Sequence, residues 1–333
     1  MKKVIIHIGS GKTGSTAIQK SLYKSKKVND NIISFPTILN QKSNQTFRFA
    51  FCGLENTTSN VKLEYLDNSE GFKKYQQEIK NSLIKSIGDS QNIIISSEFL
   101  FLCRKSEVEN IKLFFKSIGF EEVHVVVYLR DPVKYYLSVS QQSLKSQCVI
   151  PSPDRFNYDV LKAIEAWSSI EPTSFTVREF DRSKLFEGDV VRDFEHYLQS
   201  KNYNVKISKS EVENESMSVE GAVLLQEYQR LITLSNLSVE KLKFHKRKAR
   251  LFSFVATEGT KPKLKPEIED YIYCKWKSVI SGLNKEFNIF PELIKDIENK
   301  PSKELDLPTN LAFTDIVTDF DLDSYLKLKN KLK

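Results

Sequence analysis

Along the first two hundred residues, the pattern of apolar and polar positions predicts strands that alternate with helices. Short apolar runs at 4–8, 92–95 and 123–129 are typical of buried strands. Stretches at 17–24, 108–118 and 132–146 have apolar residues every three or four positions, which predicts helices. The same order recurs with a strand at 174–181 and an amphipathic stretch at 186–198. This alternation predicts an α/β fold in which helices flank both faces of a parallel β-sheet.

The pattern changes beyond residue 205, where we predict no further strand. Apolar residues at helical spacing predict one helix around 224–232 and another from about Pro266 to Phe287. No internal repeat or long Pro/Gly/Ser linker interrupts the chain, and the Asn/Ser-rich stretches at 39–46 and 55–60 are expected to be loops. We therefore expect a single domain over residues 1–333, with residues 205–333 as a largely helical addition packed on it.

Two helix starts carry recognisable capping signals. Ser15 or Thr16 is expected to cap the helix at 17–24. Asp131 is expected to cap the helix at 132–146, with Pro132 in the favoured first helical position.

Composition narrows the class of protein. A chain of 333 residues with 40% hydrophobic content can bury a substantial core. Its net charge of +7 suits anionic ligands without indicating nucleic acid. The four cysteines are far apart and form no CxxC pair, which favours reduced cytoplasmic thiols over a zinc site or a disulfide framework.

The start of the chain, "MKKVIIHIG", is similar to a signal peptide only over its first few residues. His7 and Gly9 interrupt its apolar run, and no later run is long enough to span a bilayer. We expect a soluble, cytoplasmic protein, with the inner face of the membrane as an alternative location.

The segment "GSGKTGST", residues 9–16, lies between the first strand and the first helix. Its glycines let the backbone approach a ligand closely, and the helix that follows directs N–H groups and partial positive charge at the same place. Lys12 adds a full positive charge. Together these features predict a phosphate-binding loop at the carboxyl edge of the sheet. It is not a Walker A loop, because that pattern, ending at Thr13, needs glycine where Ile6 stands.

The spacing resembles the phosphosulfate-binding loop, G-x-x-K-x-G-[ST]-T, of sulfotransferases that use 3′-phosphoadenosine 5′-phosphosulfate (PAPS). The resemblance implies a P-loop-like sheet and assigns the 5′-phosphosulfate to Gly11, Lys12, Thr13, Gly14, Ser15 and Thr16. A second signature of the family pairs an arginine with a serine eight residues later to hold the 3′-phosphate. In "YLRDPVKYYLS" these residues are Arg130 and Ser138. A guanidinium offers a planar donor fork that suits phosphate.

Two further stretches look like segments of bacterial carbohydrate sulfotransferases. They are "VREFDRSKLFEGDVVRDF" from Val177 and "NESMSVEGAVLL" from Asn214, and they extend the resemblance to about residue 235. The late Arg-Lys-Gly loop of cytosolic sulfotransferases has no convincing counterpart. The basic run "FHKRKAR", Phe244 to Arg250, is either a substitute for that loop or a solvated helical face.

The resemblance implies transfer of a sulfuryl group from PAPS to a hydroxyl or amine, a reaction that requires no metal. Lys12 is suited to stabilise the charge that grows on the leaving phosphate. Glu98 follows a buried strand in "NIIISSEFLFL", and carbohydrate sulfotransferases commonly employ a glutamate as the base. Glu98 is therefore the candidate base, with a pKa that apolar neighbours could raise, and an N-cap or salt-bridge role is the structural alternative. His7 is interpreted as a packed core residue.

The acceptor and the function class stay open at this point. The resemblance suggests a sugar hydroxyl on a bacterial surface polysaccharide, lipopolysaccharide or glycolipid precursor, with a small metabolite or lipid alcohol as alternatives. We expect no nucleic-acid partner, while peripheral contact with a membrane is compatible with the sequence, and the oligomeric state is undefined. The alternative functions are a P-loop kinase-like phosphotransferase and a catalytically silent nucleotide-binding scaffold.

Overall fold

The computed structural model describes residues 1–29, 32–209, 216–235, 237–298, 300 and 305–332. The chain divides into two compact units. The first comprises Met1–Arg130 with Asp159–Val212, and the second comprises Asp131–Tyr158 with Glu213–Lys333. The expectation of a single domain stays a prediction.

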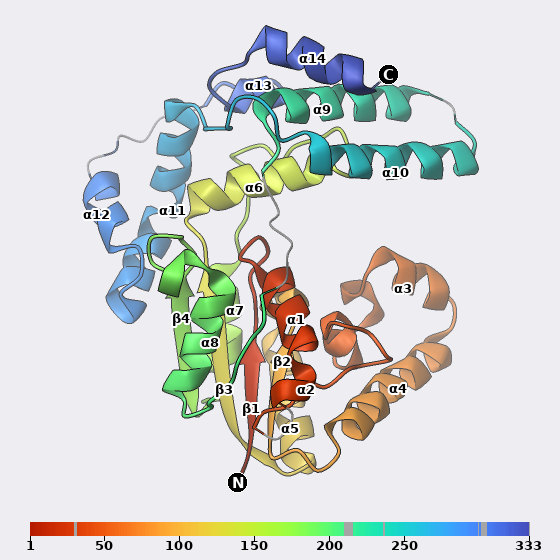
Figure 1. Cartoon of the computed structure of the whole chain (residues 1–333), viewed down its shortest axis with the longest axis vertical. Coiled ribbons are helices and arrows are strands. Elements are labelled where there is room, and N and C mark those ends of the chain that lie inside the picture. Colours follow the sequence, from red (N-terminus) through yellow and green to blue (C-terminus); the bar gives the residue numbers. More distant parts are fainter. Residues whose placement is uncertain (30–31, 210–215, 236, 299, 301–304, 333) are drawn as a thin grey trace. The chain divides into compact units, whose positions relative to one another are not determined.

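The first unit is built on a sheet of four parallel strands in the order β2-β1-β3-β4 (Figure 1). All four coincide with predicted strands, which confirms the α/β class. Their bounds are β1 (Lys2–His7), β2 (Asn92–Ser96), β3 (Phe120–Leu129) and β4 (Ser174–Glu179). In the central strands, residues 4–6 of β1 and 125–129 of β3 are all hydrophobic and fully buried, because both faces of the sheet are covered there.

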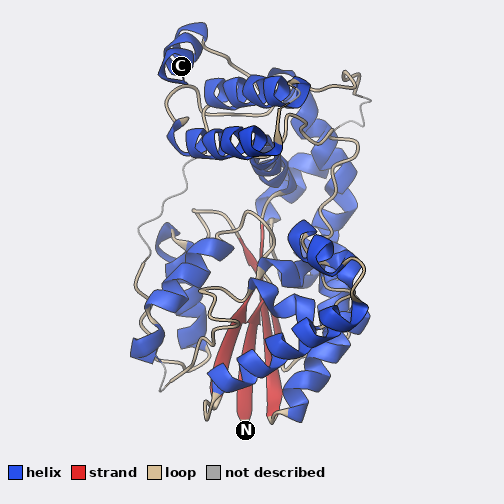
Figure 2. Ribbon diagram, turned by 90° about the vertical axis from the view of Figure 1, so that its right-hand side faces the viewer, coloured by secondary structure: helices blue, strands red, loops and turns tan. Residues whose placement is uncertain are grey.

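Helices cover both faces of this sheet (Figure 2). On one face, Ile5 and Val126 share a buried cluster with Ile18 of α1 and Phe194 of α8. Strand side chains alternate between faces, so Val125 points to the other face. There α5 packs against β3 and α7. The helices of this unit, with 3₁₀ helices marked η, are α1 (Ser15–Lys24), α2 (Lys26–Asn29), η1 (Gln45–Ala50), η2 (Leu54–Asn56), α3 (Ser59–Tyr65), α4 (Ser69–Ile87), η3 (Glu98–Leu102), α5 (Lys105–Ser117), α7 (Val160–Ser168), η4 (Phe186–Gly188) and α8 (Val190–Ser200).

The start of α1 differs from the prediction. The N-cap residue is Gly14, whose φ of 75° is left-handed, and no side chain among the described residues caps the helix. Ser15 and Thr16 already lie inside the helix, so the expectation that one of them caps it was wrong. The chain enters α1 through a backbone conformation that glycine adopts without steric cost.

The Asn/Ser-rich stretches expected to be loops are loops only in part: residues 39–44, 57 and 58 lie outside any helix, whereas the remaining positions are helical. Gln45 begins η1 at the end of the first stretch, and the second overlaps η2 and the start of α3. The long helix α4 was also not predicted. Its buried residues, Phe72, Ile79, Leu83 and Ile87, are seven or four positions apart, which is helical spacing within 19 mostly polar residues.

The second unit is helical in its described residues. Its helices are α6 (Pro132–Leu144), α9 (Val219–Leu234), α10 (Val239–Val255), α11 (Pro266–Phe287), α12 (Pro291–Glu298), α13 (Phe313–Ile316) and α14 (Leu322–Leu332). The predicted helices at 132–146 and 224–232 and from Pro266 correspond to α6, α9 and α11. Asn214 and Glu215 of the second sulfotransferase-like stretch lie outside the described residues. None of the helices described here or in the first unit has both the length and the apolar composition to cross a bilayer.

Asp131 makes two contacts at the start of α6. Its Oδ1 accepts a hydrogen bond from the Val133 N–H at 2.7 Å, which confirms the predicted cap. Its Oδ2 accepts a hydrogen bond from the Tyr273 hydroxyl of α11 at 2.8 Å. One buried carboxylate therefore fixes the start of α6 and joins it to α11.

We expect Asp131→Ala to lower the free energy of unfolding by about 2 kcal/mol, since it removes an N-cap and a buried hydrogen bond. Tyr273→Phe removes only the hydrogen bond and should cost about 1 kcal/mol. Urea unfolding followed by circular dichroism measures both. Equal losses in the two variants would show that the cap contributes nothing.

Candidate functional site

The three strands β2, β1 and β3 lie side by side and end at the same edge of the first unit's sheet. Glu98 follows β2, the loop 8–14 follows β1, and Arg130 follows β3. Two hydrogen bonds hold the three strand ends together. After β2, the Ser97 N–H donates to the His7 carbonyl of β1 at 3.1 Å, and after β1, the Ile8 N–H donates to the Val126 carbonyl of β3 at 3.0 Å. In parallel sheets this edge is where ligands bind.

Side-chain hydrogen bonds fix the shape of the glycine-rich loop. The buried Ser10 hydroxyl donates to the Tyr128 carbonyl of β3 at 2.9 Å, and the buried Thr13 hydroxyl donates to the Ser10 carbonyl at 2.7 Å. Lys12 has a φ of 65° and Gly14 a φ of 75°, both left-handed. A left-handed lysine costs on the order of 1 kcal/mol, and such strain is concentrated at ligand-binding sites.

Inside the loop, Gly9 and Ser15 lie against each other. A Cβ atom on Gly9 would collide with the Ser15 hydroxyl and would lie 3.1 Å from a ring carbon of His7. Ser15 is only 3% exposed, and its hydroxyl has no hydrogen-bond partner among the described residues. A buried polar group without a partner costs about 1 to 3 kcal/mol. A ligand oxygen held in the loop would give this hydroxyl its partner.

Arg130 lies against the same loop. Its Nη1 donates a hydrogen bond to the Lys12 carbonyl at 3.1 Å, and its guanidinium lies 5.6 Å from the centre of the Phe180 ring. The end of β3 therefore places a second cation beside Lys12. Of the other predicted loop residues, Gly11 is half-buried and Thr16 is exposed in the first turn of α1.

Glu98 is half-buried at the start of η3, on the other side of the loop from β3. Burial raises the pKa of the Glu98 carboxyl, and the positive charge of Lys12 partly opposes this shift. The Gln45 side chain of η1 donates a hydrogen bond to Glu98 Oε1 at 3.4 Å. Ser97 is the N-cap of η3, because its hydroxyl accepts from the Phe99 N–H at 3.2 Å. The carboxylate of Glu98 therefore does not serve as the N-cap.

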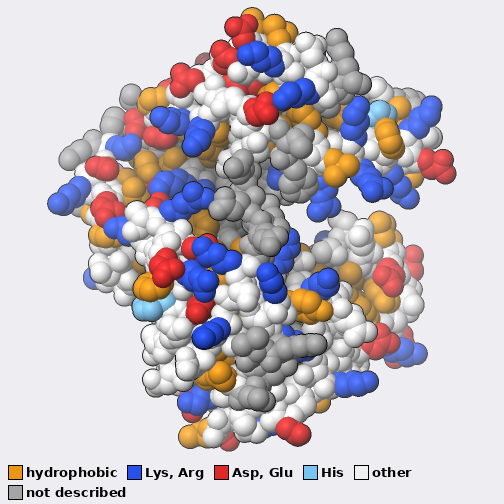
Figure 3. All heavy atoms as spheres, viewed as in Figure 1, with side chains coloured by type: hydrophobic (Ala, Val, Ile, Leu, Met, Phe, Trp, Pro, Cys, Tyr) orange, Lys and Arg blue, Asp and Glu red, His pale blue; other side chains and the backbone are white. Residues whose placement is uncertain are grey.

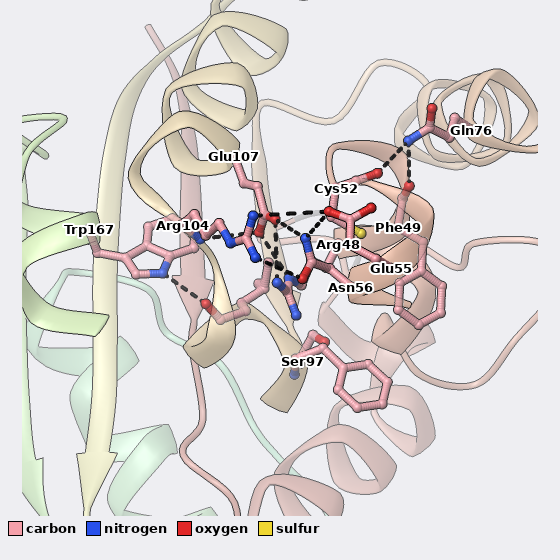
Figure 4. Close-up of polar contacts among 12 residues, drawn as sticks. Arg48, Phe49, Cys52, Glu55, Asn56, Gln76, Ser97, Arg104, Glu107 and Trp167 are labelled. Carbon is pink, nitrogen blue, oxygen red and sulfur yellow. Dashed lines mark hydrogen bonds and ion pairs between the residues drawn. The ribbon is translucent and has the colours of Figure 1, made fainter. Parts of the chain in front are cut away.

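A buried ion pair holds η1, the helix that carries Gln45. Arg48 Nε lies 3.0 Å from Glu107 Oε2 of α5, with both side chains only 6% exposed (Figure 4). The neighbouring Asn44 carbonyl oxygen of the side chain accepts a hydrogen bond from the Ser96 N–H at the end of β2, at 3.0 Å. Gln45 precedes Glu98 by 53 residues, and these tertiary contacts bring the two side chains together. No local sequence pattern therefore predicts Gln45 as a residue of the site.

His7 belongs to the core beneath the loop. It is fully buried at the end of β1, and its Nδ1 lies 2.8 Å from the Ser96 hydroxyl. Burial lowers the pKa of His7 to about 3, so the ring is neutral near pH 7. Its ring packs against Tyr128 and Phe194. These contacts fit the interpretation of His7 as a packed core residue.

Two other predicted features lie in the second unit. Ser138 is half-buried on α6, and its pairing with Arg130 around a 3′-phosphate stays a prediction. The basic run 244–250 lies on α10. Across the described residues of both units, no group of three or more His, Cys, Asp or Glu side chains is arranged to hold a metal ion.

Comparisons with known proteins do not assign a family or a function to the chain. Neither a family model nor a curated protein matches the chain. A solved structure of a sulfotransferase domain from the curacin biosynthetic pathway aligns with 62% of this chain and 76% of its own, at 12% identity and a TM-score of 0.31. A likeness at this level carries no argument about activity. Assignment of a function therefore depends on the residues at the edge of the sheet.

Proposed function

We propose that this protein is a PAPS-dependent sulfotransferase, which transfers a sulfuryl group to a hydroxyl or amine acceptor. The observation that carries the proposal is the buried, unpartnered Ser15 hydroxyl inside the loop that Lys12 and Arg130 border. This hydroxyl is a hydrogen-bond donor for an anion at the start of α1, a helix whose first turn has no acidic residue. Helix N-termini of this kind bind phosphate and sulfate groups.

In this proposal the loop residues Gly11 to Thr16 hold the 5′-phosphosulfate through backbone N–H groups and hydroxyls. Lys12 stabilises the negative charge that develops on the bridging oxygen as its bond to sulfur breaks, leaving 3′-phosphoadenosine 5′-phosphate. Donors that are already in place for such charge lower the barrier most effectively. Arg130, together with Ser138, holds the 3′-phosphate that distinguishes PAPS from other adenine nucleotides.

Glu98 is proposed as the general base. It takes the proton of the acceptor group as the acceptor oxygen or nitrogen forms its bond to sulfur. A raised pKa suits this role, since a base whose pKa is nearer neutral removes the proton more effectively. The hydrogen bond from Gln45 orients the carboxylate without giving it a charged partner.

The proposed acceptor is a sugar hydroxyl of a surface polysaccharide or glycolipid precursor, reached from the cytoplasm. Support for this step comes from the resemblance of residues 177–194 and 214–225 to bacterial carbohydrate sulfotransferases. Folds of this class serve many acceptors, so the acceptor must be identified by experiment.

Arg130→Ala should weaken binding of 3′-phosphoadenosine 5′-phosphate by about 1.5 to 3 kcal/mol, the usual value of a hydrogen bond to a charged group. Adenosine 5′-phosphosulfate lacks the 3′-phosphate and should bind wild type and variant about equally. Calorimetric titration of both nucleotides makes the comparison. A similar loss for both would mean that Arg130 only supports the loop through the Lys12 carbonyl.

The function as a whole is tested by supplying PAPS labelled in its sulfur to lysate of the source cell with the purified protein. We expect label in a glycolipid or polysaccharide fraction with the wild type and very little with Lys12→Ala. Transfer that is equal with both proteins, or label that never leaves the nucleotide, would contradict the proposal.

A further inference from the structure

Helix α10 has an unusual concentration of positive charge. Its 17 residues include six lysines and arginines and one acidic residue, Glu240. All six basic side chains are exposed: Lys241, Lys243, Lys246, Arg247, Lys248 and Arg250. The run recognised in the sequence as Phe244 to Arg250 is the middle of this helix. This basic run is not part of the sulfotransferase site that we propose at the edge of the sheet.

Large apolar side chains are exposed on the same helix and at the end of α9 before it. Phe244 is 63% exposed and Leu251 is 59% exposed. They are seven residues apart, about two turns, and so lie on one side of the helix. Leu231 and Leu234 of α9 and Val239 at the start of α10 are also exposed. Figure 3 shows lysine and arginine side chains interspersed with hydrophobic ones over this part of the second unit.

The side of α10 that packs on the unit is a different one. Ala249, Phe252 and Ser253 are buried, and the Tyr228 hydroxyl of α9 lies 2.7 Å from His245 Nδ1. At about 100° per residue, Phe244 and Leu251 lie on the outer side of the helix. Lys241 and Lys248 flank this apolar pair on one side, and Lys243, Arg247 and Arg250 on the other.

We propose that α10, with the end of α9, is a docking surface for an anionic lipid bilayer. Phe244 and Leu251 enter the boundary between headgroups and acyl chains, and the flanking lysines and arginines contact the negatively charged headgroups. A basic helix with a Phe/Leu side is the pattern of helices that lie in the membrane interface. Long basic side chains at its margins extend to the headgroups while their stems cover apolar surface.

Charge favours a bilayer over other occupants of this surface. A second copy of the chain docking through the same face would bring six exposed positive charges against six others. A nucleic acid would use the positive charge and stack a base on Phe244, but it gives no role to the exposed aliphatic side chains of Leu231, Leu234, Val239 and Leu251. An anionic bilayer is complementary to both features. The inference is independent of the proposed function, because it involves neither the loop 8–14 nor Glu98.

Sedimentation with phosphatidylcholine vesicles, with and without phosphatidylserine, tests the surface. The wild type should bind only the vesicles that contain phosphatidylserine. Lys243→Gln/Arg247→Gln/Arg250→Gln should bind about 100-fold more weakly, at about fivefold per charge removed. The matched control is Lys73→Gln/Lys74→Gln/Lys85→Gln on α4, which removes the same charge from other exposed positions and should bind as the wild type does. Circular dichroism checks that each variant is folded.

A second measurement reports whether the apolar side enters the bilayer. The tryptophan fluorescence of Phe244→Trp should be quenched by brominated acyl chains. The fluorescence of the wild type should not be quenched, because Trp167 and Trp276 are buried. The proposal would be overturned if both triple variants bound phosphatidylserine vesicles as tightly as the wild type does, or if both lost this binding equally. An unquenched tryptophan in Phe244→Trp would also overturn it, because the basic helix would then recognise a soluble polyanion. Binding to polyuridylate without binding to vesicles would lead to the same conclusion.

Discussion

Replacing Lys12 with alanine should lower the turnover number by about 100- to 1000-fold with saturating PAPS, the usual effect of losing one preorganised donor to developing charge. The charge on the leaving phosphate is largest in the transition state, so the loss should appear mainly in turnover and less in PAPS affinity. The left-handed backbone of Lys12 and the contact of its carbonyl with Arg130 fix where the side chain leaves the loop. Release of 3′-phosphoadenosine 5′-phosphate under single-turnover conditions measures the effect directly.

Lys20→Ala is the matched control, because Lys20 is exposed on α1, the helix that follows the loop. It removes the same charge from the helix next to the loop and should leave turnover within about twofold, since exposed charges far from the reacting atoms interact weakly. An unchanged turnover number in Lys12→Ala, with a normal melting temperature, would remove Lys12 from catalysis.

Glu98→Gln should lower turnover by about 100-fold or more, which is typical for the loss of a general base. Glutamine keeps the size of the side chain but cannot accept the proton. Because burial raises the pKa of Glu98, the acidic limb of the wild-type rate profile should be centred above the ordinary glutamate pKa of about 4.3. Below this limb the carboxyl is protonated and inactive, so the rate falls as pH falls. In the variant this limb should disappear.

The control for Glu98 is Glu109→Gln, at an exposed position on α5, which should leave the pH profile unchanged. His7 cannot account for a limb near neutrality, because burial lowers its pKa to about 3. A folded Glu98→Gln protein with near-normal turnover and the same acidic limb would place the base elsewhere.

Three of the four strands were predictable because they contain short runs of apolar residues, such as Ile93 to Ile95, and the fourth because strands and helices alternate along the chain. The helix at 108–118 was predictable because Val108, Ile111 and Phe115 repeat at helical spacing, and all three are buried. The helix η1 was not predictable. It is held by the Arg48–Glu107 ion pair, which joins positions 59 residues apart and leaves no local pattern.

At the candidate site, the sequence predicted which residues follow strands but not how they meet. Strand order decides that β2, β1 and β3 are neighbours, so that Glu98, the loop and Arg130 share one edge. The left-handed Lys12, the contact of Arg130 with its carbonyl and the buried Ser15 hydroxyl depend on backbone geometry that residue types alone do not determine. The same is true of Gln45, which reaches Glu98 from a segment expected to be a loop.

Calorimetric titration with 3′-phosphoadenosine 5′-phosphate in the presence of EDTA distinguishes a PAPS-dependent enzyme from a kinase and from a silent scaffold. We expect saturable binding without a divalent metal, at least about tenfold tighter than binding of adenosine 5′-monophosphate, because Arg130 adds a charge-assisted contact to the 3′-phosphate. ATP with magnesium should bind no better than the monophosphate. Tight binding of magnesium-ATP with no preference for the 3′-phosphate would contradict the account and favour a kinase, and no binding of either nucleotide would contradict it and favour a silent scaffold.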